Sequence, residues 1–532
     1  MAITAETSTV ILPRAPQGVF RNEPFTDFSR HDVAHAMRES LTRVGEQLGH
    51  EYPLIIGGER VKTSGKIESR NPARPAQIVG IHQKAGAEHA DQAVEAALKA
   101  FETWRFVSAE ERASLLFHAA EIIRNRHLDF CAWLTYEVGK NWAESDADVG
   151  ETIDFLEFYA REALRLAKST TPIQYPGERN ELHYIPLGVG AVISPWNFPF
   201  AIMAGMTAAA IVTGNTVVLK PSSDSPTIAA RFMEVLEEAG LPPGVVNFCP
   251  GSGATFGNAV VAHPKTRFIA FTGSKDVGLD IHERAAKTQP GQIWIKRTIL
   301  EMGGKDSIIV CADADFDKAV DGVIASAFGF SGQKCSACSR AIVEEPIYHD
   351  FVDRLRHRAA ALKVGDPTQN PNMGPVVSEG AYKTILDYIA IGKKEGRVVA
   401  GGEAIETPEK GYYIAPTVIA DIAPGARISQ EEIFGPVLAV IPARNFEHAL
   451  EIANNTEFGL TGAIYSTDRI KLDRARNEFH VGNLYFNRKC TGAMVGAHPF
   501  GGFNMSGTDS KAGGPDYLYL FTQAKSVGEK LA

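Results

Sequence analysis

From about residue 187 onward, short apolar segments alternate with segments of helical periodicity, and this alternation restricts the fold more than any other feature of the sequence. Strands that are connected through helices lie parallel in one sheet, so the pattern predicts an α/β protein. The alternation resumes after residue 301, which predicts a second α/β domain. The expected strands are residues 188–194, 216–219, 245–248, 268–272, 307–310 and 341–344, and the expected helices are 226–239, 277–286, 316–328 and one from 347.

The size and composition of the chain agree with a globular protein of several domains. Its 532 residues exceed what one hydrophobic core usually serves, so two or three domains are expected. A net charge of -9 without a basic run argues against nucleic-acid binding. The six cysteines are sparse and irregularly spaced, and the N-terminus has no signal or transit pattern. We therefore expect a cytoplasmic protein in a reducing compartment.

One segment could be mistaken for a membrane span, because residues 184–219 contain no formally charged side chain. A spanning helix needs about 20 predominantly apolar residues in helical continuity, whereas prolines and asparagines interrupt this segment. It is therefore predicted to form a strand, a turn, a helix and a second strand inside the protein, and no membrane partner is expected.

The N-terminal part carries weaker patterns. Residues 1–30 lack strong periodicity and are expected to form an arm on the surface. Apolar residues then recur every three or four positions over 33–48, which indicates an amphipathic helix. Ser108 and Glu111 have the spacing of a capping box, so a further helix is predicted to begin there.

Two segments are predicted to form exposed β-structure. Residues 167–186 are polar, with three prolines and a central Pro-Gly-Glu turn, which suits a projecting hairpin. Residues 521–527 are predicted to form a terminal strand. Exposed strand edges invite pairing with another subunit, although an ordinary surface hairpin explains the pattern equally well.

Cys335 and Cys338 form a C-x-x-C motif that has three interpretations. A zinc site needs about four ligands, and the remaining cysteines offer no second pair. A thioredoxin-like redox pair normally follows a strand, whereas a helix is expected before this motif. In the third interpretation Cys335 is a nucleophile whose thiolate is favoured by the adjacent Lys334, and Cys338 is a small core residue. The spacing alone leaves these interpretations open.

Two further turns contain residues with catalytic potential. Glu301 stands at an expected strand end beside two glycines, where it could act as a general base or simply form a surface ion pair. Asn197 lies in the proline-framed turn SPWNFP (194–199), where its amide could donate to an oxyanion or the turn could be purely structural.

Glycine-rich loops and strand ends suggest a phosphate-containing ligand. The loop from Gly251 to Gly257 lacks the G-x-G-x-x-G fingerprint, so by itself it is a weak nucleotide signal. The sequence FTGS (271–274) follows a strand and precedes a helix, whose N-terminus can face a phosphate. Lys220 ends another strand, where ligands of open α/β sheets usually bind.

Taken together and in order, these segments resemble the aldehyde dehydrogenase superfamily, from about residue 50 to the end. The resemblance implies a Rossmann-type NAD-binding domain, a second α/β catalytic domain and a small β oligomerisation hairpin. The NAD-binding domain with the N-terminal arm would comprise residues 1–166 and 187–299, and the catalytic domain residues 300–503. The hairpin and the C-terminal strand would comprise residues 167–186 and 504–532. The segments that carry it are SPWNFP (194–199), VVLKPS (217–222), FTGS (271–274), LEMGGK (300–305), GQKC (332–335), EEIFGP (431–436) and PFGG (499–502).

A narrower resemblance points to bacterial stand-alone L-glutamate γ-semialdehyde dehydrogenases, which act in proline degradation. It rests on NEPFTDF (22–28), FSGQKCSACSR (330–340) and TGAMVGAHPF (491–500). This family oxidises the semialdehyde to L-glutamate and forms dimers or larger assemblies. Another semialdehyde dehydrogenase, such as one for succinate semialdehyde, is the alternative, and a catalytically inactive homologue is the alternative outside enzymes.

The resemblance also assigns catalytic roles. Cys335 would attack the aldehyde, the Asn197 amide and the Cys335 backbone N–H would hold the oxyanion, and Glu301 would activate water. Ser336, Gly492 and Ala493 would anchor the substrate carboxylate, Phe198 and Phe500 would enclose its aliphatic part, and Glu151 would lie near the reacting centre or on a solvated helix face.

NAD is the expected cofactor. Many relatives carry a Glu for the adenosine ribose where this chain has Ser223, so use of NADP stays open. Lys220 would lie near the adenosine ribose, Ser274 near the pyrophosphate, Glu432 at the nicotinamide ribose and Phe434 beside the nicotinamide. The full set expected at the cofactor is Ile193, Pro195, Trp196, Lys220, Ser222, Ser223, Gly253, Gly257, Thr272, Gly273, Ser274, Met302, Gly303, Glu432 and Phe434, and no metal is expected.

Overall fold

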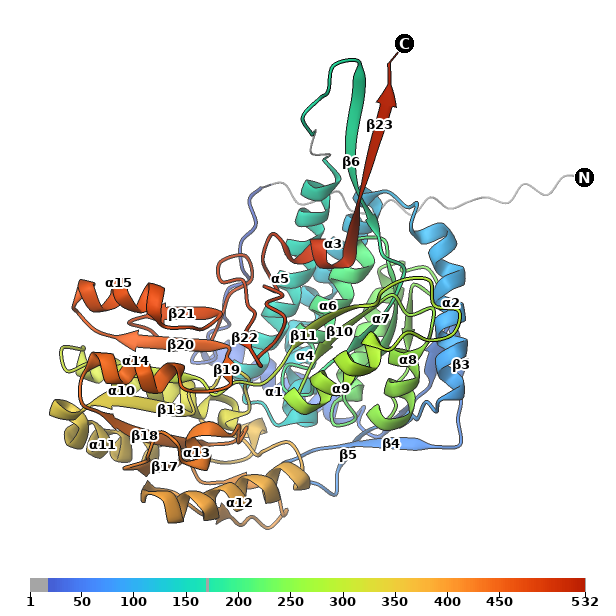
Figure 1. The fold of residues 1–532 in the computed structure, drawn as a ribbon. Helices are drawn as coiled ribbons and strands as arrows, with labels where there is room; N and C mark the ends of the chain where they lie inside the picture. The colour runs from blue at the N-terminus through green and yellow to red at the C-terminus, as the bar shows by residue number, and fades with distance from the viewer. Residues whose placement is uncertain (1–17, 169–171, 532) are drawn as a thin grey trace, which may run out of the picture.

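The computed structural model describes residues 18–168 and 172–531, which fold into two α/β units and a projecting two-stranded ribbon (Figure 1). The first unit is built around a seven-stranded sheet in the order β11-β10-β7-β8-β9-β2-β3. Its strands β11, β10, β7, β8 and β9 are parallel, as the alternation predicts. The bounds are β11 Arg297–Glu301, β10 Phe268–Thr272, β7 Val189–Ile193, β8 Thr216–Lys220, β9 Val246–Phe248, β2 Leu54–Ile56 and β3 Glu59–Val61.

Helices cover both faces of this sheet. Successive residues of a strand point to opposite sides, and in β7 the residues on both sides are apolar and buried. In β7, Val192 belongs to one hydrophobic cluster, while Val189, Ala191 and Ile193 belong to the other. The first cluster is completed by α1 His31–Gly45, α3 Ala109–Asn125, α4 His127–Val138, α5 Trp142–Ala167, α6 Ala201–Val212 and α7 Pro226–Glu238, and the second by α2 Glu88–Trp104, α8 Asn258–Ala262 and α9 Lys275–Ala286.

Several local predictions for this unit are confirmed. The helix expected at 33–48 is α1, and the capping box at α3 forms, with the Glu111 N–H donating to Ser108 Oγ (3.2 Å). Residues 184–219 contain the end of β6, then β7, the SPWNFP turn, α6 and most of β8. Within the part of the chain that the structure describes, no helix is long and apolar enough to cross a membrane.

The second unit contains another seven-stranded sheet, in the order β14-β17-β18-β13-β12-β20-β21, which confirms the predicted second α/β domain. Helices α10 and α11 pack on one face, and α12, α14 and α15 pack on the other. The strands are β14 Arg397–Ala400, β17 Thr417–Ala420, β18 Val437–Ala443, β13 Arg340–Glu344, β12 Ser307–Val310, β20 Thr461–Tyr465 and β21 Asn483–Phe486, and the helices are α10 Phe316–Phe328, α11 Glu345–Ala360, α12 Glu379–Glu395, α14 Phe446–Asn454 and α15 Arg469–Glu478.

The boundary predicted between residues 299 and 300 falls inside β11, which stays in the first sheet up to Glu301. Short elements complete the chain. They are β1 His50–Tyr52, β4 Lys66–Arg70, β5 Ile78–Gln83, β15 Ala404–Ile405, β16 Tyr413–Ile414, β19 Phe458–Gly459, β22 Phe503–Asn504, α13 Arg427–Gln430, and the helical turns η1 Gly253–Gly257, η2 Gly329–Gly332, η3 Pro367–Gln369 and η4 Tyr517–Phe521.

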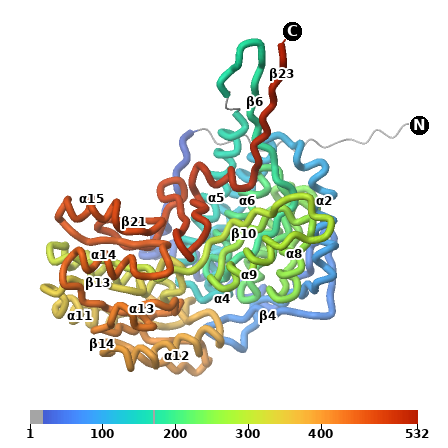
Figure 2. The backbone as a smooth tube through the Cα atoms, in the orientation of Figure 1, coloured from blue at the N-terminus to red at the C-terminus, as the bar shows by residue number. Residues whose placement is uncertain are grey.

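The projecting β-structure differs from the hairpin predicted within 167–186. In the described part of this segment only β6, Glu178–Pro186, is a strand, and it pairs antiparallel with the terminal strand β23, Thr522–Lys530 (Figure 2). Pro172 and Pro176 precede β6 and cannot donate to a β-ladder, which explains why the preceding residues do not form the second strand. The predicted terminal strand 521–527 therefore has its partner within the same chain.

Candidate active site

The carboxyl ends of four parallel strands meet at one edge of the first sheet. Ile193 of β7 lies in register with Lys220 of β8 and Phe271 of β10, and Thr272 lies in register with Glu301 of β11. Ligands of open α/β sheets bind at such an edge. A cavity of about 860 Å³ opens there and extends to Cys335.

Every position expected at the cofactor lines this cavity, and the structure also brings Cys335 and Asn197 to its wall. The expected residues in the wall are Ile193, Pro195, Trp196, Lys220, Ser222, Ser223, Gly253, Gly257, Thr272, Gly273, Ser274, Met302, Gly303, Glu432 and Phe434. Sequence reasoning missed further wall residues, among them Asp224, Asp276, Val277 and Asp280. Asp224 directly follows Ser223, and the other three lie on the first turns of α9, so the strand-loop-helix pattern itself would have revealed them.

The cavity is built for an extended polar ligand with an anionic part. Lys220 is buried and ends β8, and burial lowers the pKa of its ammonium to about 8. The first backbone N–H groups of α9 follow Ser274 at the wall, and a helix N-terminus favours anions. A Cβ on Gly253 would meet no atom within 4 Å, so the glycine leaves open space beside the ligand. These donors and this space fit a dinucleotide.

The opposite wall holds a carboxylate and two aromatic rings. The Gly304 N–H donates to Glu432 Oε1 (2.9 Å), and burial raises the pKa of the Glu432 carboxyl to about 7. A Cβ on Gly303 would lie only 2.2 Å from the Glu432 carboxylate, which explains the glycine there. The Phe434 ring packs edge-on against Trp196, with ring centroids 5.3 Å apart.

Cys335 follows a short strained turn between α10 and β13. Phe330 and Ser331 adopt φ values of 49° and 55°, which are uncommon for residues other than glycine. Buried contacts hold this turn, because Ser331 Oγ donates to the Gly374 carbonyl (2.8 Å) and Gln333 Oε1 accepts from the Val377 N–H (2.8 Å). Strain of this kind concentrates at functional sites, and here it presents Cys335 to the cavity.

The surroundings of the Cys335 thiol favour its protonated form. Burial raises its pKa well above the ordinary value, and the nearby acids Asp306, Glu432 and Glu301 raise it further. Lys334 was expected to favour the thiolate, but its ammonium forms an ion pair with Glu144 (2.6 Å) instead. Adjacency in sequence misled here, because successive side chains of an irregular loop point in different directions.

Asn197 is held against the cysteine loop. Its buried Nδ2 donates to the Gln333 carbonyl, two residues before Cys335 (3.2 Å). The amide group has two N–H bonds, so one remains for an oxyanion at the cysteine. The expected catalytic position of Asn197 therefore agrees with its surroundings.

Glu301 lies at the end of β11, and its carboxyl group has two properties of a proton acceptor. Ser510 Oγ donates to its Oε1, while the buried Oε2 has no hydrogen-bond partner among the described residues. Burial raises the pKa of its carboxyl to about 8. A base with a pKa near the working pH is suited to proton transfer.

None of the positions expected at the substrate is among the residues that line this cavity. Ser336 is buried directly after Cys335, while Gly492 is exposed and adopts a φ of 75°. Ala493 follows it in the same loop, and the Phe500 backbone pairs with Ala512 through two hydrogen bonds of 2.7 and 2.8 Å. No described contact joins these residues into one carboxylate site.

A buried ion pair close to Lys334, the residue before Cys335, was not predicted. Lys140 and Asp148 form an ion pair (2.9 Å) whose side chains are both 0% exposed. Lys140 Nζ also lies 3.9 Å from the centroid of the Phe198 ring, so it fixes that expected substrate residue. Glu151 is partly buried one turn along α5, and burial beside Asp148 raises the pKa of its carboxyl to about 8. Glu151 is therefore not an ordinary solvated side chain.

The C-x-x-C motif does not form a metal site in the described residues. Cys338 is buried and donates its thiol to the Arg340 carbonyl (3.5 Å), and all six cysteines are free. The candidate metal group among described residues is His127, Cys131 and Asp146, which does not include this motif. Cys338 thus packs as a core residue beside the Cys335 loop.

Comparison with known proteins identifies the family of this chain. The profile of the aldehyde dehydrogenase family matches residues 60–527, which is most of the chain. The chain belongs to the aldehyde dehydrogenase family. The 1-pyrroline-5-carboxylate dehydrogenase of Geobacillus thermodenitrificans (strain NG80-2) is 59% identical over 511 residues, covering 96% of this chain and 99% of that protein. The corresponding protein of Bacillus cytotoxicus is 56% identical over 513 residues, with the same coverage.

Solved structures also resemble the structure of this chain over most of its length. The 1-pyrroline-5-carboxylate dehydrogenase from Thermus with bound NAD has a TM-score of 0.95 and 52% identity, covering 97% of this chain and 99% of that chain. Proline utilization A from Bdellovibrio bacteriovorus also has a TM-score of 0.95, with 46% identity, and there the match covers 97% of this chain but 54% of that one.

Proposed function

We propose that this aldehyde dehydrogenase oxidises L-glutamate γ-semialdehyde, the open form of 1-pyrroline-5-carboxylate, to L-glutamate with NAD in proline degradation. The observation that carries the proposal is the single cavity in which Cys335 and Asn197 adjoin every position expected at the cofactor. The similarity to relatives named 1-pyrroline-5-carboxylate dehydrogenase supports the substrate.

The residues of the cavity supply the binding groups for NAD. Lys220 and the N-terminus of α9 would hold the adenosine ribose and the pyrophosphate, and Glu432 would accept hydrogen bonds from the nicotinamide ribose. Bound NAD supplies the hydride acceptor. Asp224 places a carboxyl group at the wall next to Ser223. This carboxylate would repel the 2′-phosphate of NADP, although it lies one residue after the position at which many relatives carry a Glu. This supports a preference for NAD.

Cys335 carries the covalent chemistry in this proposal. Its thiol transfers a proton to a water molecule, and the sulfur forms a bond to the aldehyde carbon while the π bond of the carbonyl breaks and its oxygen becomes an oxyanion. The free N–H of Asn197 and the Cys335 backbone N–H donate to that oxyanion. After oxidation of the aldehyde carbon, Cys335 holds the acyl group as a thioester.

Glu301 completes the cycle as the general base. Its carboxylate takes a proton from a water molecule as the water oxygen attacks the thioester carbon, and the carbon–sulfur bond breaks. L-Glutamate leaves and the Cys335 thiolate regains a proton. The partly unpartnered Glu301 carboxyl supports this role, because one oxygen is free to accept.

The substrate has an α-carboxylate and an α-ammonium besides the aldehyde. We assign the carboxylate to Ser336 and to the backbone N–H groups of Gly492 and Ala493, because hydroxyl and N–H groups donate to anions. Phe198 and Phe500 would enclose the aliphatic part, and Glu151 supplies a carboxyl near Lys140, whose ammonium lies over the Phe198 ring.

Self-association as a dimer or larger assembly is part of the proposal, as is a cytoplasmic location. The β6–β23 ribbon projects from the molecule with exposed strand edges, which favours pairing with another subunit (Figure 1). Light scattering at micromolar concentration tests this, and a monomer would refute it. Six free cysteines support a reducing compartment.

Steady-state kinetics test the function directly. We expect the highest kcat/KM with L-glutamate γ-semialdehyde and NAD, a lower value with NADP, and a lower value with succinate semialdehyde. Succinate semialdehyde dehydrogenase is the second candidate, because it would use the same Cys335 and Glu301. A higher kcat/KM with succinate semialdehyde would replace the proposed substrate by that one.

A further inference from the structure

The N-terminal arm contacts the loop that we assign to the substrate carboxylate. Asn22 Nδ2 donates to the Val495 carbonyl (3.0 Å) and to Asp154 Oδ2 on α5 (2.8 Å). Val495 is buried two residues after Ala493. One amide side chain therefore links the start of the chain, α5 and the 491–496 loop.

A second contact strengthens this link. The Phe20 ring packs edge-on against Phe158 of α5, with centroids 5.2 Å apart. Gly496 lies directly over both rings, since a Cβ there would come within 3.2 Å of each. Gly496 also adopts a φ of 79°, which a residue with a Cβ adopts at a cost. The backbone of the loop thus rests on the arm and on α5 together.

The arm is fixed to α5 at two carboxylates. The Glu23 N–H donates to Asp154 Oδ1 (2.8 Å), and the Thr26 N–H donates to Asp146 Oδ2 (2.9 Å). Asp146 and Asp154 are eight residues apart on α5, and Gly150 lies between them beside the arm, because a Cβ there would be in ordinary van der Waals contact with Glu23 Cβ (3.6 Å).

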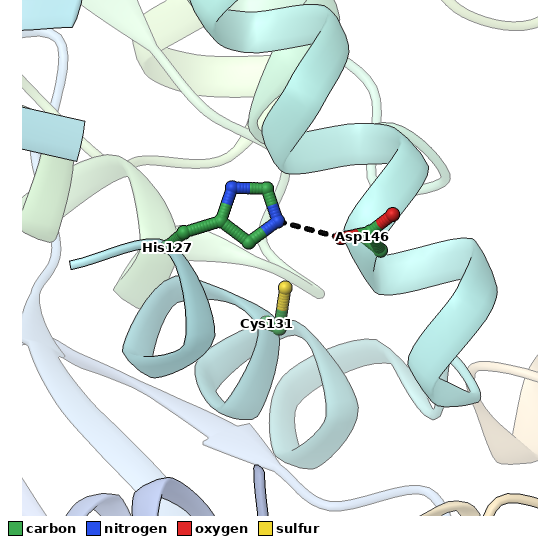
Figure 3. A group of neighbouring side chains, drawn as sticks. All are labelled: His127, Cys131 and Asp146. Atoms are coloured by element: carbon green, nitrogen blue, oxygen red, sulfur yellow. Dashed lines mark hydrogen bonds and ion pairs between the residues drawn. The ribbon is translucent and has the colours of Figure 1, made fainter. Parts of the chain in front are cut away.

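His127 completes the fixation of Asp146. Its ring on α4 points to α5, and Nε2 lies 2.7 Å from Asp146 Oδ1, with the thiol of Cys131 beside them (Figure 3). These three residues have ligand atoms close enough to hold a metal ion. However, both Asp146 oxygens are already occupied, one by His127 and one by the arm, so the group is explained as the anchor of the arm.

Helix α5 carries the charged network near Cys335 on a different face. Glu144 and Asp148 each lie about 160° around the helix from Asp146, given 100° per residue. Asp148 pairs with Lys140, and Glu144 pairs with Lys334. The helix is therefore shared by the arm, which holds the 491–496 loop, and by the groups that surround Phe198.

We propose that Asn22 is a positioning residue for substrate recognition: it holds the 491–496 loop so that the backbone N–H groups of Gly492 and Ala493 meet the α-carboxylate. This rests on the proposed function. Asn22 touches neither the wall of the cavity nor Cys335, and its bonds to Val495 and Asp154 are its route to the substrate.

The test compares Asn22→Ala with the unchanged chain on two aldehydes. L-Glutamate γ-semialdehyde has the α-carboxylate, whereas propanal has none. Loss of one hydrogen bond that orders the loop corresponds to an increase in KM of about 5-fold for the semialdehyde. We expect kcat for the semialdehyde to stay within about 2-fold and both parameters for propanal to stay unchanged.

Glu23→Gln is the matched control, because the Glu23 side chain binds Arg124 and not the loop. It should leave both KM values unchanged. Equal changes on both aldehydes in Asn22→Ala, or no change on either, would overturn the proposal. Failure of the unchanged chain to oxidise the semialdehyde would instead overturn the proposed function and this inference with it.

Discussion

Replacing Glu301 by Gln separates the two halves of the proposed reaction. Gln keeps the size of the side chain and can still hydrogen-bond with Ser510, but it cannot take a proton from water. The attack of Cys335 and the oxidation step do not need this base in our account. We therefore expect a rapid first turnover, in which one NADH forms per active site, followed by very slow further turnover.

The magnitude follows from the raised pKa of the Glu301 carboxyl, about 8. At pH 7 about one eleventh of the side chains are ionised, and at pH 9 about ten elevenths, so the rate of thioester hydrolysis should rise about tenfold between them. A general base contributes about 10²–10⁴-fold. The deficit of Glu301→Gln should therefore be about tenfold larger at pH 9 than at pH 7.

Stopped-flow absorbance of NADH measures both phases in one experiment. The unchanged chain should show a slow phase that rises with pH through about 8, and Glu301→Gln should show one that does not follow this titration. Ser510→Ala serves as the control, because loss of its hydrogen bond raises the pKa of Glu301 further and should move the profile to higher pH. Loss of the rapid phase in Glu301→Gln would instead show that Glu301 acts before the thioester forms.

Three further predictions concern neighbouring groups. Asn197→Ala removes one oxyanion donor and should lower kcat/KM by about 10²–10³-fold, whereas an unchanged value would remove Asn197 from the mechanism. Asp224→Asn removes the carboxyl beside Ser223 and should lower KM for NADP more than KM for NAD; equal changes would contradict its role in cofactor choice. Lys140→Met leaves the buried Asp148 without its partner and should reduce the free energy of unfolding, measured by chemical denaturation, by about 3–5 kcal/mol. Addition of Asp148→Asn should recover part of this loss. A loss below about 1 kcal/mol would show that the ion pair is not essential for stability.

The residues that line the cofactor cavity could be predicted from the sequence, because many of them lie at the ends of parallel strands. Ile193, Lys220, Thr272 and Glu301 end four neighbouring strands, and such ends necessarily meet at one edge of a sheet. Their proximity therefore depends only on the strand order, which the alternation of strands and helices restricts. The motifs that surround Cys335 and Glu432 identified the remaining wall.

Contacts between segments far apart in the chain could not be predicted in this way. Lys334 pairs with Glu144, 190 residues earlier, so its position next to Cys335 in sequence gave a misleading expectation. The pairing of β6 with β23 likewise joins two ends of the chain, while the local Pro-Gly turn favoured a hairpin. In both places tertiary packing selects the partner, and local sequence carries no information about it.

NADH formation by Cys335→Ala and by Cys338→Ala, with L-glutamate γ-semialdehyde and NAD, tests whether Cys335 or Cys338 forms the covalent bond to the aldehyde. We expect no detectable turnover in Cys335→Ala. Cys338→Ala should retain substantial turnover, because the Cys338 thiol is buried and faces the Arg340 carbonyl. Full activity in Cys335→Ala would show that Cys335 is not the nucleophile.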